Sequence, residues 1–73
     1  METRIKALRE DNDLTQETVA AAIGITQRKY SYLETGVQQW PDELLVKLAA
    51  YYQTSVDYLL GLTDEQRPYP RRK

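Results

Sequence analysis

Apolar residues recur along the chain at intervals of three and four, the spacing of amphipathic helices. Ile5 with Leu8, and later Leu45 with Leu48, place apolar side chains on one helical face. Glycine, proline and Asn-Asp turns separate these segments. The pattern predicts a compact all-α fold of five helices: Thr3 to Asp11, Gln16 to Ile23 after a Thr15 cap, Gln27 to Thr35, Pro41 to Tyr52, and Val56 to Leu60 after a Ser55 cap.

Local signals mark where these helices begin and end. The hydroxyls of Thr15, Thr26 and Ser55 can each accept a hydrogen bond from a free backbone N–H at a helix start. Gly24 and Gly36 follow helix ends, where a left-handed backbone is favoured. The side chains predicted to form the core are Ile5, Leu8, Val19, Ala20, Ile23, Ile25, Tyr30, Leu33, Leu44, Leu45, Leu48, Ala49, Tyr52, Val56, Tyr58, Leu59 and Leu60.

The chain has 73 residues, enough for one small domain, and contains neither cysteine nor histidine. Disulfides, zinc fingers and Cys/His nucleophile pairs are therefore excluded. No phosphate-binding loop or metal-ligand cluster is visible, so we expect no cofactor, no metal site and no enzymatic activity. The N-terminal residues lack the apolar run of a signal peptide or membrane span, which favours a cytoplasmic protein without a membrane partner.

The net charge of −1 conceals an asymmetry along the chain. Residues 66–73 contain four basic and no acidic residues, whereas residues 1–65 contain six basic and eleven acidic residues, a net charge of −5. The body is therefore acidic and the tail basic. Because local potential decides contact with a phosphate backbone, the placement of the six body cations matters more than the total.

Residues 16–35 have the pattern of two short helices joined by a tight glycine turn, which is a helix-turn-helix signature. Ala20 is small enough for the two helices to approach closely, and Gly24 bends the chain. The second helix keeps one face free of core residues. That face carries amide, guanidinium and hydroxyl groups suited to base edges in a major groove: Gln27, Arg28, Ser31 and Tyr32, with Lys29 at its flank.

The whole set of motifs resembles the XRE family of DNA-binding regulators, which includes the lambdoid phage repressors and Cro proteins. The resemblance covers residues 3–62 and rests on Arg9, Leu14-Thr15-Gln16, Ala20, Ile23-Gly24-Ile25, Leu33-Glu34 with Gly36, and the closing segment 55–61. It implies a lambda-repressor-like DNA-binding domain at residues 1–62. From Thr63 onward, Pro68, Pro70 and the charged residues predict an extended or disordered basic tail at residues 63–73.

The resemblance also implies roles for individual residues of the recognition helix. Gln27 matches the position that bonds adenine, and Gln16 matches the glutamine that contacts phosphate and buttresses it. Arg28 matches the next base-reading position, where a guanidinium suits guanine. Tyr32 occupies a further reading position, near a thymine methyl or a phosphate, and Ser31 is a weaker candidate.

Two further features follow from the resemblance. Arg9 and Glu34 match a structural ion pair that ties the first helix to the end of the third. The loop after Gly36 is often basic in the phage members, but here it contains Gln38 and Gln39. Their amides and backbone N–H groups can still bond phosphate.

The function predicted from these features is sequence-specific binding of double-stranded DNA by a dimeric transcriptional regulator, a repressor, without a cofactor. Candidates for the homodimer surface are the apolar side chains Trp40, Tyr51, Leu62 and Tyr69, although Trp40 is equally a core candidate. The alternative is an antitoxin or another protein-interaction module of the same fold, whose main partner is a protein. Substituting Gln27 and Arg28 separates the two hypotheses, because only DNA reading depends on them.

Overall fold

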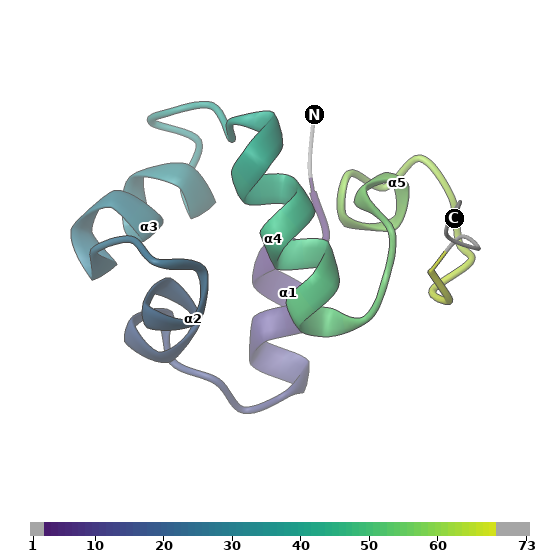
Figure 1. The fold of residues 1–73 in the computed structure, drawn as a ribbon, viewed down its shortest axis with the longest axis horizontal. Helices are drawn as coiled ribbons and strands as arrows, with labels where there is room; N and C mark the ends of the chain where they lie inside the picture. The colour runs from purple at the N-terminus through teal and green to yellow at the C-terminus, as the bar shows by residue number, and fades with distance from the viewer. Residues whose placement is uncertain (1–2, 69–73) are drawn as a thin grey trace.

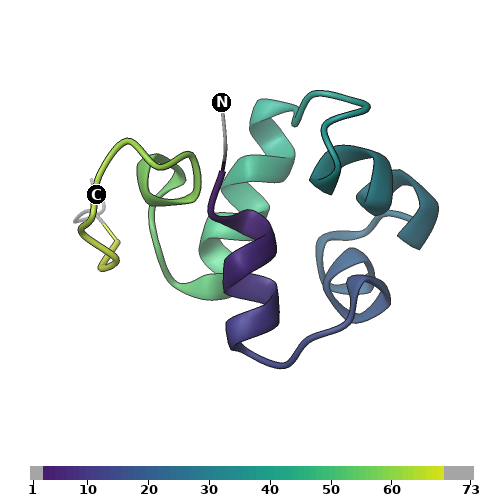
Figure 2. The ribbon, with the colours of Figure 1, turned by 180° about the vertical axis from the view of Figure 1, so that it is seen from behind.

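The computed structural model of the protein describes residues 3–68 and contains five helices and no strand within that range. They are α1 (Ile5–Asp11), α2 (Gln16–Ile23), α3 (Gln27–Glu34), α4 (Asp42–Tyr52) and α5 (Val56–Leu59). The pair α2 and α3 lies at one end of the molecule and α5 at the other, with α1 and α4 between them (Figures 1 and 2). The predicted all-α fold of five helices is confirmed.

The helix starts and ends follow the local chemistry of the sequence. Thr15 and Thr26 each accept a hydrogen bond from the backbone N–H three residues on, at 3.1 Å, and Ser55 does the same at 3.0 Å. After α2 the chain turns at Gly24, whose φ is 81°, in the left-handed region where a side chain is strained. These short-range bonds fix each helix start at a defined residue.

One hydrophobic core holds α1, α2, α3, α4 and α5 together. Its largest fully buried side chains are Tyr30, Ile5, Leu48, Leu59 and Val19. Each helix therefore contributes to the same core. Burying the apolar surface of these side chains is the main stabilising contribution available to a chain of this size.

The structure corrects several boundaries and burial predictions. α1 begins at Ile5, two residues later than predicted, and Pro41 precedes α4 as its N-cap instead of forming its first residue. α5 is a single turn that ends at Leu59. Because a single turn at the edge of the bundle covers little surface, several predicted core side chains on and near α5 are only half-buried, namely Tyr52, Val56, Tyr58 and Leu60. Ile25, in the turn between α2 and α3, is also only half-buried.

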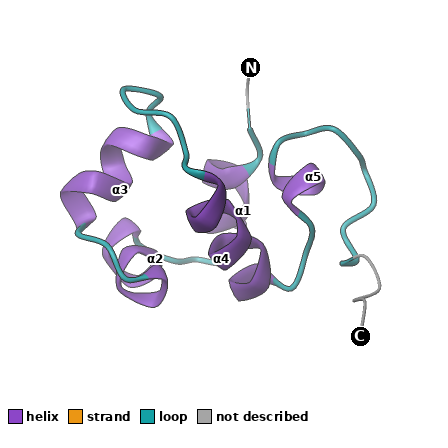
Figure 3. Ribbon diagram, turned by 45° about the horizontal axis from the view of Figure 1, so that its top comes forward, coloured by secondary structure: helices purple, strands orange, loops and turns teal. Residues whose placement is uncertain are grey.

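Residues 63–68 form no helix and run beside α5 (Figure 3). The hydroxyl of Thr54 donates to the carbonyl of Gln66 at 2.5 Å, and Arg4 pairs with Asp64 at 2.6 Å. The Arg4 guanidinium also lies 4.6 Å from the centre of the Tyr58 ring. None of the described helices is long and apolar enough to cross a lipid bilayer.

Candidate nucleic-acid interface

The two helices of the predicted helix-turn-helix pack directly on each other through small and apolar side chains. Ala20 on α2 is 1% exposed, which leaves room for α3, and Tyr30 and Leu33 of α3 are buried. Between the helices, the N–H of Ile25 donates to the carbonyl of Ala20 at 3.0 Å across the Gly24 turn. The turn therefore holds α3 in a fixed position against α2.

The face of α3 that does not contact the core is open to solvent. Gln27, Arg28 and Lys29 are exposed, and Ser31 is half-buried. Tyr32 is 37% exposed, and its hydroxyl accepts a hydrogen bond from Nε of Arg28 at 3.3 Å, one helical turn earlier. The amide of Gln27 has no hydrogen-bond partner among residues 3–68. This face thus presents an amide, a guanidinium and a phenol to solvent.

The exposed charges on α3 are all positive. The exposed charged side chains of this helix, Arg28 and Lys29, are both basic. Glu34, the acid of the helix, lies at its C-terminal end with a side chain only 3% exposed, paired with Arg9. The exposed face of α3 is therefore locally positive although the body of the chain carries a net charge of −5, and local positive potential is what attracts a polyanion.

The predicted pair of Arg9 and Glu34 is present and shielded from solvent. Nε and Nη2 of Arg9 donate to the two carboxylate oxygens of Glu34, each at 2.9 Å, in the bidentate geometry that Arg favours. Burial raises the pKa of Glu34, but the hydrogen bonds from Arg9 and Gln16, the nearby Tyr30 hydroxyl and the charge of Arg9 together lower it by more, so the net shift is downward. The bonds between Arg9 and Glu34 raise the pKa of Arg9. Glu34 is therefore ionised at neutral pH.

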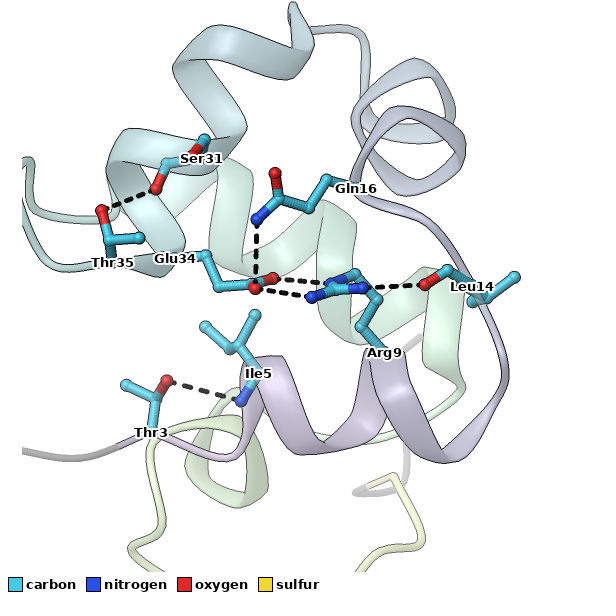
Figure 4. Close-up of polar contacts among 8 residues, drawn as sticks. All are labelled: Thr3, Ile5, Arg9, Leu14, Gln16, Ser31, Glu34 and Thr35. Carbon is cyan, nitrogen blue, oxygen red and sulfur yellow. Dashed lines mark hydrogen bonds and ion pairs between the residues drawn. The ribbon is translucent and has the colours of Figure 1, made fainter.

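Figure 4 shows that this pair is the centre of a larger polar cluster. Nη1 of Arg9 donates to the carbonyl of Leu14 at 2.9 Å, in the turn before α2. Nε2 of Gln16, the first residue of α2, donates to Glu34 at 3.3 Å. The cluster Arg9, Leu14, Gln16 and Glu34, called the Arg9–Glu34 node below, connects α1, the following turn, α2 and α3.

The loop between α3 and α4 lies against the end of α3. Gln38 and Gln39 are exposed, and the N–H of Gln38 donates to the carbonyl of Tyr32 at 3.1 Å. Trp40 is half-buried, and its ring meets the Tyr30 ring edge-on with centroids 5.7 Å apart. With Leu33, Trp40 lines a groove of about 920 Å³ between α1 and this loop.

Comparison with known proteins agrees with this geometry. Residues 5–59 match the family described as Helix-turn-helix. The chain belongs to the XRE-type helix-turn-helix family of transcriptional regulators. The match spans all five helices. The members of this family are transcriptional regulators and not enzymes.

The chain is also similar to individual proteins. It is 43% identical over 70 residues to an uncharacterised HTH-type transcriptional regulator, YobD of Bacillus subtilis, covering 96% of this chain and 62% of YobD. It is 36% identical over 59 residues to the cryptic phage CTXphi transcriptional repressor RstR of Vibrio cholerae, covering 81% of this chain and 53% of RstR.

A solved structure is also similar. The crystal structure of a transcriptional regulator from Listeria innocua matches with a TM-score of 0.76 and 26% identity, covering 85% of this chain and 58% of the other. The chain thus spans between about half and three fifths of the length of the relatives it matches.

Within this helix-turn-helix domain, the structure brings most of the predicted site residues to one end of the molecule, on α2, α3 and the loop that follows. Gln16 lies apart from the exposed side chains of α3, half-buried against Glu34, and residues 3–68 contain no hydrogen bond between the amides of Gln16 and Gln27. Of the proposed dimer residues, Tyr51 and Leu62 are exposed, and Tyr69 lies outside the described residues.

The sequence reasoning missed the bond between Gln16 and Glu34 and the bond between Arg9 and the Leu14 carbonyl. Gln16 and Glu34 are 18 positions apart. No local signal joins them, because the contact exists only once α2 and α3 have packed. The motif Leu14-Thr15-Gln16 marks the start of α2 without indicating which side chains meet there.

Proposed function

We propose that the chain is the sequence-specific double-stranded DNA-binding domain of a transcriptional repressor, acting in the cytoplasm and reading the major groove with α3. The observation that carries this proposal is the exposed face of α3, which is positive and rich in hydrogen-bonding groups while the opposite face is buried. A helix of this kind fits the B-DNA major groove, which is about 12 Å wide. The helix-turn-helix relatives named as a regulator and a repressor support it.

The side chains on that face suit different partners. The amide of Gln27 can bond adenine at two positions, and the guanidinium of Arg28 can bond guanine in the same bidentate way. Tyr32 and Ser31 lie one turn further along α3, towards the loop. Gln38 and Gln39, with Gln16 at the start of α2, are proposed to contact phosphates.

The domain is proposed to bind as a two-fold dimer, with half-sites about one helical turn, roughly 34 Å, apart. Tyr51 and Leu62, 39% and 63% exposed, offer apolar surface away from α3. Half-buried Trp40, in the loop after α3, is a separate candidate. Sedimentation with and without operator DNA tests this dimer. A monomer in both conditions would contradict it.

The basic tail is proposed to contact flanking DNA. The molecule is 34 Å long, and residues 63–68 lie at the end opposite α3 (Figure 1). The tail would therefore contact DNA that neighbours the segment read by α3. Deleting residues 66–73 should lower affinity and flatten the slope of log K against log salt, and an unchanged slope would contradict this role.

A protein-interaction module such as an antitoxin is the second candidate function. The groove of about 920 Å³ beside Trp40 and Leu33 favours it, because a concave surface with an exposed aromatic edge can seat a partner's side chain. In that case the groove, and not the exposed face of α3, would carry the main binding energy.

The experiment that tests the proposed function is selection of the purified protein on a random duplex DNA library at about 0.15 M salt, where non-specific phosphate binding is weak. Enrichment of an inverted repeat is the expected result, and it would supply the operator. No enrichment would contradict DNA reading by this chain and would turn the search to a protein partner.

A further inference from the structure

The hydrogen bond between Gln16 and Glu34 determines which end of the Gln16 amide faces outward. A carboxylate can only accept hydrogen bonds, so the atom of Gln16 that meets Glu34 has to be its nitrogen. Nε2 lies 3.3 Å from Oε1 of Glu34, and Figure 4 shows the amide oxygen turned away from it. One N–H and the carbonyl oxygen of Gln16 remain available on the outer side.

Arg9 makes this arrangement compatible with DNA. A carboxylate near the start of α2 would otherwise repel a phosphate. Both oxygens of Glu34 bond Arg9, and the side chain of Glu34 is only 3% exposed. Glu34 can therefore fix the amide of Gln16 while its own charge is neutralised. The third bond of Arg9, to the Leu14 carbonyl, holds the turn immediately before Gln16.

We propose that Glu34 is a positioning residue for DNA binding, which fixes the amide of Gln16 with its nitrogen inward and its oxygen outward at the start of α2. This inference rests on the proposed DNA-binding function. It extends the role of the Arg9–Glu34 pair from holding helices together to setting the donor and acceptor positions that Gln16 presents to DNA. A phosphate then meets the remaining N–H, and a donor such as an amide meets the oxygen.

A double-mutant cycle on the duplex enriched by selection tests the proposal. Glu34→Gln replaces the acceptor-only carboxylate by an amide that can face Gln16 either way round, and Gln16→Met removes the bond at similar side-chain volume. Glu34→Gln should weaken binding about tenfold in the wild-type background, since a hydrogen bond to a charged group is lost. In the Gln16→Met background the same substitution should change the affinity less than about twofold.

Glu10→Gln is the matched control. It makes the same chemical change at an exposed residue of α1, which has no bond to Gln16, and therefore measures the general effect of removing one negative charge. The affinity of Glu10→Gln for the selected duplex should stay within about twofold of the wild-type affinity, because one exposed charge contributes little. All variants are compared at a temperature where circular dichroism shows them folded. Equal losses from Glu34→Gln in both backgrounds would overturn the proposal, because Glu34 would then act only through the fold.

A second measurement keeps the proposal testable if Glu34→Gln does not fold or if the wild type binds no duplex. The side-chain amide protons of Gln16 are identified in NMR spectra by their loss in Gln16→Met. In the free wild-type protein these resonances should shift as Glu34 is protonated, at a pH below the ordinary carboxyl pKa of 4.5. Gln16 resonances that do not move in that range would overturn the positioning role. Absence of any duplex binding would instead contradict the proposed function.

Discussion

Two arginines near the two ends of α1 each pair with a carboxylate. The two pairs have the same chemistry but differ in their exposure to solvent and in the number of hydrogen bonds that the arginine makes. Arg4 meets Asp64 at 2.6 Å, with side chains 35% and 96% exposed. Arg9 meets Glu34 at 2.9 Å, with side chains 14% and 3% exposed. The shorter contact is the one in water, where two long side chains gain little by pairing. Distance is therefore a poor guide to which pair supports the fold.

The number of bonds separates the two pairs further. Arg4 uses one nitrogen for Asp64, whereas Arg9 uses three, two for Glu34 and one for the Leu14 carbonyl. The exposed pair joins α1 to residues 63–68, at the end of the molecule away from α3. The Arg9–Glu34 node joins α1, α2 and α3 at the proposed DNA-binding end. The comparison indicates that the fold depends on the second pair and only slightly on the first.

Removal of Arg9 should cause the largest loss in the free energy of unfolding. Arg9→Met leaves the carboxylate of Glu34 shielded from water without a cation, which should lower the free energy of unfolding by about 3 kcal/mol. Urea unfolding followed by the fluorescence of Trp40, the single tryptophan, measures it. Lys6→Met, an exposed cation on the same helix, is the control. Equal losses in the two variants would break the distinction between the pairs.

Replacing Arg9 by lysine should cause an intermediate loss in the free energy of unfolding. Arg9→Lys keeps the charge, but an ammonium group cannot reproduce the two parallel bonds to Glu34 together with the bond to Leu14. We expect a loss of about 1.5 kcal/mol in the free energy of unfolding. Arg4→Lys, the same change in the exposed pair, should cause no measurable loss. If Arg9→Lys were as stable as the wild type, charge alone would explain the buried pair.

The pH dependence of stability should show that the ionised form of Glu34 stabilises the fold. Its pKa is lower in the folded chain than its ordinary value of 4.5, so its contribution is fully present above that value and disappears as the pH falls through the lowered folded pKa. The difference in unfolding free energy between wild type and Glu34→Gln should therefore shrink as the pH falls below 4.5. The other carboxylates are common to both proteins. A difference that stayed constant over this range would show that the ionised form is not what stabilises the fold.

The smallest effect is expected from Asp64→Asn. Asp64 is almost fully exposed, and water and salt screen its pairing with Arg4, so the melting temperature should not change measurably. Differential scanning calorimetry in low salt provides the most sensitive comparison. A loss as large as that of Arg9→Lys would mean that residues 63–68 help to hold the fold.

Much of the fold was predictable because its signals are local. The caps at Thr15, Thr26 and Ser55 depend on a hydroxyl and an N–H three residues apart, and the Gly24 turn depends on one residue's freedom to adopt a positive φ. Helical spacing likewise identified the buried faces of α2 and α4. The pairing of Arg9 with Glu34 was available only through the family resemblance, because 25 positions separate the two residues.

The parts that were not predictable depend on tertiary packing. The Gln16 bond to Glu34, the Thr54 bond to Gln66 and the Arg4 pair with Asp64 join residues 12 to 60 positions apart. Gln53 adopts a left-handed conformation, with φ of 55°, at the end of α4, although glutamine gives no signal for it. The burial of α5 was overestimated because the pattern does not show that this helix is a single turn at the edge.

The central claim, that the exposed face of α3 reads DNA, is tested most directly by Gln27→Ala combined with Arg28→Ala. Affinity is measured by fluorescence anisotropy at about 0.15 M salt on the selected duplex and on a scrambled duplex, with Lys47→Ala on α4 as the control. Two lost base contacts should reduce the ratio of the two affinities about a hundredfold, with the fold intact. A ratio unchanged from that of the wild type would contradict the claim.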